Sequence, residues 1–120
     1  MESEVTINDP LKGARGVEVV RVYACRIARR MLLSRNCESD HPVLLIEQNL
    51  IQMAQSKLQE FLLASFPDGE QDRVKKRVSD SIRRIAANKI RSSEEDQEVK
   101  EGLIQELYSM SPNDLLPPVH

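Results

Sequence analysis

Aromatic side chains are the residue class that this sequence has least of. Phe, Tyr and Trp together make up 3% of the 120 residues, and tryptophan is absent. A hydrophobic core must therefore be built from Leu, Ile, Val, Ala and Met side chains. The flat rings on which proteins stack unpaired bases are nearly missing too, and this disfavours recognition of single-stranded nucleic acid by stacking.

Cysteine is scarce as well, with only Cys25 and Cys37 in the chain. Two cysteines cannot build a disulfide framework, and no further Cys or His stands at the spacing of zinc ligands. The N-terminal residues 1–4 lack the basic and apolar blocks of a signal peptide. We therefore expect reduced thiols in an intracellular protein, cytoplasmic or nuclear, a disulfide between the two cysteines being the alternative.

Long apolar runs and an excess of one charge are also missing. No uninterrupted stretch approaches the ~20 apolar residues that span a bilayer, so we expect no transmembrane helix and no membrane partner. The formal net charge is −2, whereas a protein that binds nucleic acid over its whole surface carries a clear positive excess. With 40% hydrophobic residues the chain is too apolar for wholesale disorder, and its length fits one folded domain.

The residue sets that enzymes need are not found either. His41 precedes a proline and His120 is the last residue, and no Cys or Ser pairs with either in a recognisable nucleophile–base pattern. The four glycines do not have the spacing of a phosphate-binding loop, and the acidic run 94–96 does not match a calcium loop. We therefore expect no enzyme, no cofactor and no bound metal.

What the sequence does contain is apolar residues that recur every three or four positions, the period of an amphipathic helix. This pattern predicts an all-α fold, a compact bundle of about four helices. The expected helices span about 16–35, 42–65, 70–91 and 93–110. No Gly or Pro separates the last two, so a single bent helix is an alternative. The expected domain covers residues 15–110, between a flexible N-terminal arm, 1–14, and a flexible C-terminal tail, 111–120.

The second of these segments is the most apolar. Its expected core stripe consists of Ile46, Leu50, Met53, Ala54, Leu58, Phe61 and Leu62, widened by Leu44, Leu45, Ile51 and Leu63. A helix that is apolar over so much of its circumference is typical of a central helix with at least two neighbours. The first segment has a narrower apolar face, formed by Val17, Val20, Ala24, Ile27, Ala28 and Met31.

Two features point to a binding role. Leu45, Leu63 and Phe66 lie at the margins of the stripe or near a helix end, so they either cover the ends of the bundle or form an apolar groove. The third segment is rich in Lys and Arg, and one side of its helical wheel carries Arg73, Arg77, Arg84 and Arg91. That row either meets a partner or is neutralised by the acidic stretch 94–106 of the same chain.

We therefore predict a non-catalytic protein–protein interaction domain, an adaptor or a regulatory protein. It binds a helical or acidic segment of a partner protein in an apolar groove flanked by basic residues, and a homodimer is a further possibility. The candidate partner-binding residues are Leu45, Leu63, Phe66, Arg73, Arg77, Arg84 and Arg91.

The alternative hypothesis is a nucleic-acid-binding regulator that uses the arginines of the first and third helices. The candidate phosphate-contacting residues are Arg26, Arg29, Arg30, Lys76 and Arg83. Such a protein loses affinity steeply with salt, because neutralised phosphates release their counterions. The C-terminal stretch 114–118 is interpreted either as a short linear ligand or as a frayed end.

Overall fold

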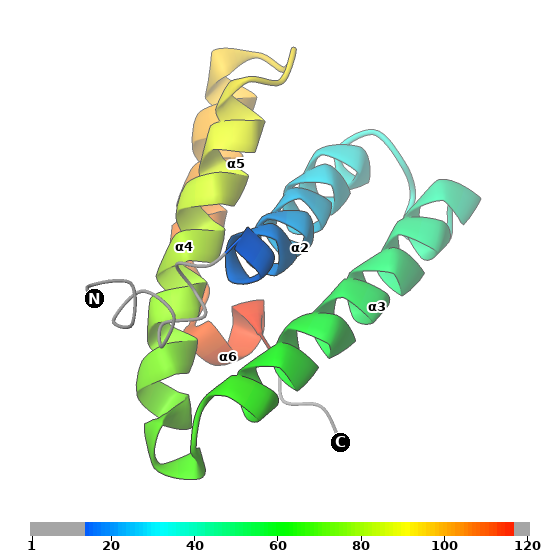
Figure 1. Cartoon of the computed structure of the whole chain (residues 1–120). Coiled ribbons are helices and arrows are strands. Elements are labelled where there is room, and N and C mark those ends of the chain that lie inside the picture. Colours follow the sequence, from blue (N-terminus) through cyan, green and yellow to red (C-terminus); the bar gives the residue numbers. More distant parts are fainter. Residues whose placement is uncertain (1–13, 117–120) are drawn as a thin grey trace.

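The computed structural model describes residues 14–116, and all regular secondary structure in this range is helical. The helices are α2 (Ala14–Ser34), α3 (Pro42–Ser65), α4 (Gln71–Arg91), α5 (Gln97–Ser109) and the short α6 (Pro112–Leu115) (Figure 1). The predicted all-α fold is thereby confirmed. None of these helices is long and apolar enough to cross a membrane. Apart from Ala14, the expected N-terminal arm lies outside the described residues.

Local signals in the sequence determine the ends of α3. Pro42 stands in the first turn, where its missing N–H is not needed, and the Nδ1 atom of His41 accepts a hydrogen bond from the N–H of Val43 (3.1 Å). Pro67 follows the other end and cannot continue the helix. The observed span, 42–65, is therefore the predicted one.

The structure shows α4 and α5 as two helices, so the alternative of one bent helix is wrong. Residues 92–96 separate them. The N–H of Ser92 donates to the carbonyl of Asn88 (3.1 Å), and the hydroxyl of Ser93 donates to the carbonyl of Ile90 (2.6 Å). These bonds satisfy carbonyl groups of the last turn, which ends α4 without a glycine or a proline.

The central helix is α2. It packs against α3 on one side and against α4 on the other, and it lies between them in Figure 1. Ala24 and Ala28 are fully buried, and side chains this small let neighbouring helices approach closely. The predicted α2 stripe is buried except for Val17, and Tyr23 joins it. The packing of α3 is mainly on α2, so the expectation of a central α3 with two neighbours is wrong.

The face of α3 that turns inward also differs from the predicted stripe. The buried residues are Leu44, Glu47, Ile51, Ala54, Leu58 and Leu62. Ile46 and Met53, which were predicted for the core, are 60% and 61% exposed. Apolar residues of α3 occupy most of its circumference, so their spacing alone does not decide which face packs inward. Glu47 also lies on the buried side, and a core prediction that considers only apolar residues cannot include it.

Residues 111–116 pack against the core, which corrects this part of the flexible tail predicted for 111–120, and residues 117–120 lie outside the described residues. Leu115 and Leu116 are 1% and 0% exposed. The helix α6 packs on α4, and Ser111 and Asp114 form a capping box at its start. The hydroxyl of Tyr23 donates a hydrogen bond to the carbonyl oxygen of Leu115. The folded domain therefore extends at least to Leu116 and does not stop at residue 110.

Two basic side chains of α4 hold the same segment. Arg83 Nη2 donates to the carbonyl oxygen of Met110, and Lys75 Nζ donates to Oδ1 of Asn113 (2.8 Å). Part of the positive charge of α4 is thus used inside the fold to fix the C-terminal segment.

Because the hydroxyl of Tyr23 is buried, the free energy of unfolding should change with pH in the alkaline range. Burial disfavours the phenolate and raises the pKa of Tyr23 from 10.0 to about 12, while the charge of Arg30 acts in the opposite direction. The folded state therefore keeps a proton that the unfolded chain loses above pH 10. The resulting contribution to the free energy of unfolding is fully present below pH 10 and is lost as the pH rises through 12.

We expect Tyr23→Phe to lower the free energy of unfolding by about 1 kcal/mol at pH 8, because a buried hydrogen bond is removed. The deficit relative to the unaltered protein should shrink steadily above pH 10. Urea denaturation at several pH values measures it, with Tyr108→Phe at an exposed position of α5 as the control. A deficit that stays constant up to pH 12 would contradict the assignment of a buried, protonated phenol.

Candidate interaction surface

The side of α3 that faces away from α2 exposes several large apolar residues. Leu45, Ile46, Met53 and Leu63 are each more than half exposed. At 100° per residue they share one side of the helix with polar and charged positions. This surface, the α3 outer face, consists of Leu45, Ile46, Asn49, Gln52, Met53, Ser56, Lys57, Glu60 and Leu63, all of them exposed.

The α3 outer face is unusual because it carries so little charge. The solvent side of an amphipathic helix is normally rich in charged residues. On the 24 residues of α3 the charged side chains are Glu47, which is buried, and Lys57 and Glu60. Figure 1 shows α3 at one edge of the molecule, with α2 between it and α4. A helix face that is apolar, poor in charge and uncovered is typical of an interaction surface.

The α4 arginine row, Arg73, Arg77, Arg84 and Arg91, lies on the exposed side of its helix, as the helical wheel predicted. Arginines of this row make polar contacts with nearby residues of the chain. Arg73 Nη2 pairs with Oε1 of Glu70 (2.8 Å), and Arg91 Nη1 donates to Oδ1 of Asn88 (3.0 Å). Arg77 and Arg84 line one surface hollow beside the start of α2.

The structure does not bring the predicted apolar and basic residues together. Leu45 and Leu63 lie on the α3 outer face, whereas the arginine row lies on α4, and α2 separates these helices. Phe66 is partly buried against the core instead of lining a groove with the two leucines. The apolar surface that the structure shows is therefore a helix face, and it is not flanked by the α4 arginine row.

The residues that sequence reasoning missed on this surface are Ile46 and Met53, because both were assigned to the core. The signal that identifies them is Glu47. Once this acid is placed on the inner face, the helical period turns Ile46 and Met53 outward.

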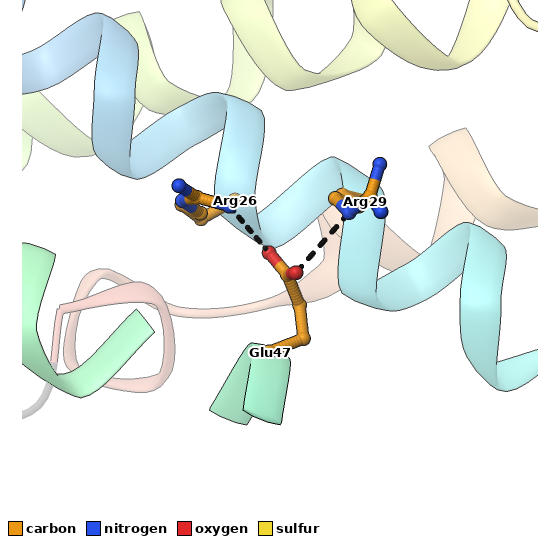
Figure 2. A network of polar contacts seen from close by, with 3 residues as sticks. All are labelled: Arg26, Arg29 and Glu47. Carbon is orange, nitrogen blue, oxygen red and sulfur yellow. Dashed lines mark hydrogen bonds and ion pairs between the residues drawn. The ribbon is translucent and has the colours of Figure 1, made fainter. Parts of the chain in front are cut away.

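Glu47 is held between two arginines of α2 (Figure 2). Its side chain is 4% exposed; Oε1 accepts from Arg26 Nη1 (3.3 Å) and Oε2 accepts from Arg29 Nε (3.1 Å). Arg30, the residue after Arg29, donates from Nη1 to Oε1 of Gln48 (3.1 Å). A buried carboxylate is costly unless it is paired, so this contact fixes the rotation of α3 against α2.

The alternative phosphate-contacting residues are therefore largely engaged within the chain. Arg26, Arg29 and Arg30 bind α3, as just described. Arg83 is 12% exposed in its side chain and pairs with Oδ1 of Asp80 (2.8 Å) in addition to holding the C-terminal segment. Lys76 is exposed on α4. These five residues do not form one surface.

No metal centre emerges from residues 14–116, where no three His, Cys, Asp or Glu side chains are grouped closely enough to hold an ion. Cys25 and Cys37 are free thiols in this structure, both partly buried. Comparisons with protein-family models, curated proteins and solved structures found no significant match to this chain. Function is therefore inferred from the surfaces described above.

Removing the two sides of the Glu47 contact should have unequal effects. The double substitution Arg26→Met and Arg29→Met leaves a buried carboxylate without a partner, so we expect the free energy of unfolding to fall by about 3 kcal/mol. Glu47→Met leaves two arginines that reach water and a methionine that packs against α2. We expect that loss to stay below about 1 kcal/mol.

Urea denaturation at neutral pH measures both changes. Arg73→Met, which removes an exposed ion pair with Glu70, is the matched control and should cost roughly 0–1 kcal/mol. Equal losses for Glu47→Met and for the double arginine variant would show that burial of the carboxylate does not determine the packing of α3.

Proposed function

We propose that this protein is a non-catalytic interaction domain, an adaptor or regulatory protein, that binds a partner protein through the α3 outer face. The observation that carries the proposal is the group of four large apolar side chains on that face, each more than half exposed. The buried Glu47 supports it, because the contact with α2 holds this face outward. The proposal replaces the predicted groove by a helix face, and a cytoplasmic or nuclear location remains part of it.

The size of the apolar group indicates a binding site of moderate strength. Full burial of a Leu, Ile or Met side chain gains about 1.5–3 kcal/mol, and roughly half of that is still available at each of the four residues. The summed gain from burying the four side chains is on the order of 4 kcal/mol. This gain only offsets the lowest estimates of the entropy lost when two proteins associate. The partner must therefore also form hydrogen bonds with polar side chains of the face, such as Asn49, Gln52 and Ser56.

A photo-reactive benzophenone residue in place of Met53 tests this proposal in the cells that make the protein. We expect irradiation to yield protein adducts at position 53, because a bound partner covers the α3 outer face. The same residue in place of Gln105, an exposed position of α5, is the control and should yield far fewer adducts. Mass spectrometry identifies the attached protein.

Adduct formation at position 53 should fall at least tenfold when Leu45→Glu and Leu63→Glu are added. Both positions are exposed, so circular dichroism should show an unchanged helix content. Equal labelling at positions 53 and 105, or labelling that persists in the folded double variant, would refute the α3 outer face as the binding surface.

A second candidate function is nucleic-acid binding through α4. The observation that favours it is the placement of all four arginines of the α4 arginine row on one exposed side, with Lys76 beside them. Arginine forks match phosphate oxygens well, and such a row follows a phosphate backbone without reading bases. The contacts of Arg26, Arg29 and Arg30 with α3 limit this candidate to α4.

Titration of labelled duplex DNA and RNA at 50 and 200 mM salt tests the second candidate. If α4 binds phosphates, affinity should fall by at least tenfold between the two salt concentrations. Arg84→Glu should weaken binding, whereas Arg35→Glu, at an exposed position just after α2, should not. Absence of binding at 50 mM salt would eliminate this candidate.

A further inference from the structure

The α3 outer face has a pattern of side chains that complements itself. Six of its residues follow one another at alternating steps of three and four positions. They are Ile46, Asn49, Met53, Ser56, Glu60 and Leu63, and all six are exposed. Alternating steps of three and four keep a line of side chains on one side of a helix, which is the spacing of the contact line in helix pairs.

From this pattern we infer that α3 pairs with α3 of a second copy of the chain, antiparallel and around a two-fold axis. The inference rests on the proposed function, since it names the occupant of the α3 outer face. Placing Ile46 opposite Leu63 of the second copy brings Asn49 opposite Glu60 and Met53 opposite Ser56. The two-fold axis then passes between Met53 and Ser56, and each of these three contacts occurs twice.

The apolar residues match in this register. The largest aliphatic side chains, Ile46 and Leu63, meet at both ends of the paired segment. In the middle, Met53 packs over the small Ser56, so large residues face small ones near the axis. Leu45, one position before Ile46, extends the apolar contact at each end. Every large exposed apolar side chain of α3 other than Val43 near the start of the helix thus takes part.

The charges select the antiparallel direction. The side-chain amide of Asn49 donates to the carboxylate of the opposite Glu60, and the two Glu60 residues lie about 16 Å apart along the pair, beyond the screening length at physiological salt. A parallel pair in register would instead place Glu60 against Glu60 and Lys57 against Lys57, which repel. Like charges therefore meet directly only when the helices are parallel, and this favours the antiparallel direction.

The dimensions of the face predict the strength of the dimer. The segment from Ile46 to Leu63 is about 26 Å long, and one helix face of this length lies at the low end of interface sizes. Interfaces of that size form reversible complexes. The dimer should therefore have a dissociation constant in the micromolar range, on the order of 10 µM.

Sedimentation equilibrium of the full chain from 1 to 500 µM tests the inference. We expect the weight-average mass to rise from the monomer value of 13.7 kDa toward twice that value. Leu63→Glu and Ile46→Lys, each alone, should raise the dissociation constant at least tenfold. Tyr108→Glu, at an exposed apolar position of α5, is the matched control and should leave it unchanged.

The double variant Ile46→Lys with Leu63→Glu tests the register. In the antiparallel pair the two new side chains face each other with opposite charges, so dimerisation should recover relative to both single variants. If the helices were parallel, each new lysine would face a lysine and each new glutamate a glutamate, and dimerisation would be lost. Circular dichroism verifies that each variant keeps its helices, and Met53→Glu replaces any variant that does not.

Three results would overturn the inference: a monomer at every concentration, a dimer unaffected by the single variants, or a double variant that does not recover. The photo-adducts at position 53 show whether only the dimer inference fails or the proposed function fails as well. A monomer whose position 53 still attaches a different protein refutes the second copy as occupant and keeps the α3 outer face as a binding surface. A monomer without such adducts refutes both.

Discussion

The buried carboxylate of Glu47 is the interaction on which the arrangement of the helices depends. A charged group in the interface between two helices tolerates one geometry only, the one in which its oxygens meet donors, whereas apolar side chains accept many. Arg26 and Arg29 supply those donors from α2. Since α3 is apolar on both sides, this contact decides which side is inside, and the exposed leucines, isoleucine and methionine are its consequence.

Much of the fold follows from short-range patterns in the sequence. The ends of α3 are specified by Pro42 and Pro67, so they are predictable from neighbouring residues alone. The rotation of α3 and the centrality of α2 are different, because both depend on residues that meet only after folding. Glu47 looks like a solvent-facing acid until the arginines of another helix are placed beside it. The burial of Leu115 and Leu116 was missed for the same reason.

The candidate surface was therefore predictable only in part. Leu45 and Leu63 stand at the margins of the apolar stripe, and that position alone suggested exposure. Ile46 and Met53 gave no such signal, since helical spacing fits them to either face. The α4 arginine row was identified from its spacing, but spacing does not reveal that α2 separates it from the exposed apolar residues. The helices could be predicted from the sequence, but their positions relative to one another could not.

The hydrogen bond from Tyr23 to the Leu115 carbonyl joins residues 92 positions apart. During synthesis on the ribosome, α2, α3 and α4 all emerge before the residues that complete their shared interior. Until Leu115 and Leu116 have been synthesised, the part of the core that they complete stays exposed to water. Closure of the interior thus depends on α6, whose contact with Tyr23 forms late because a long loop must be closed first.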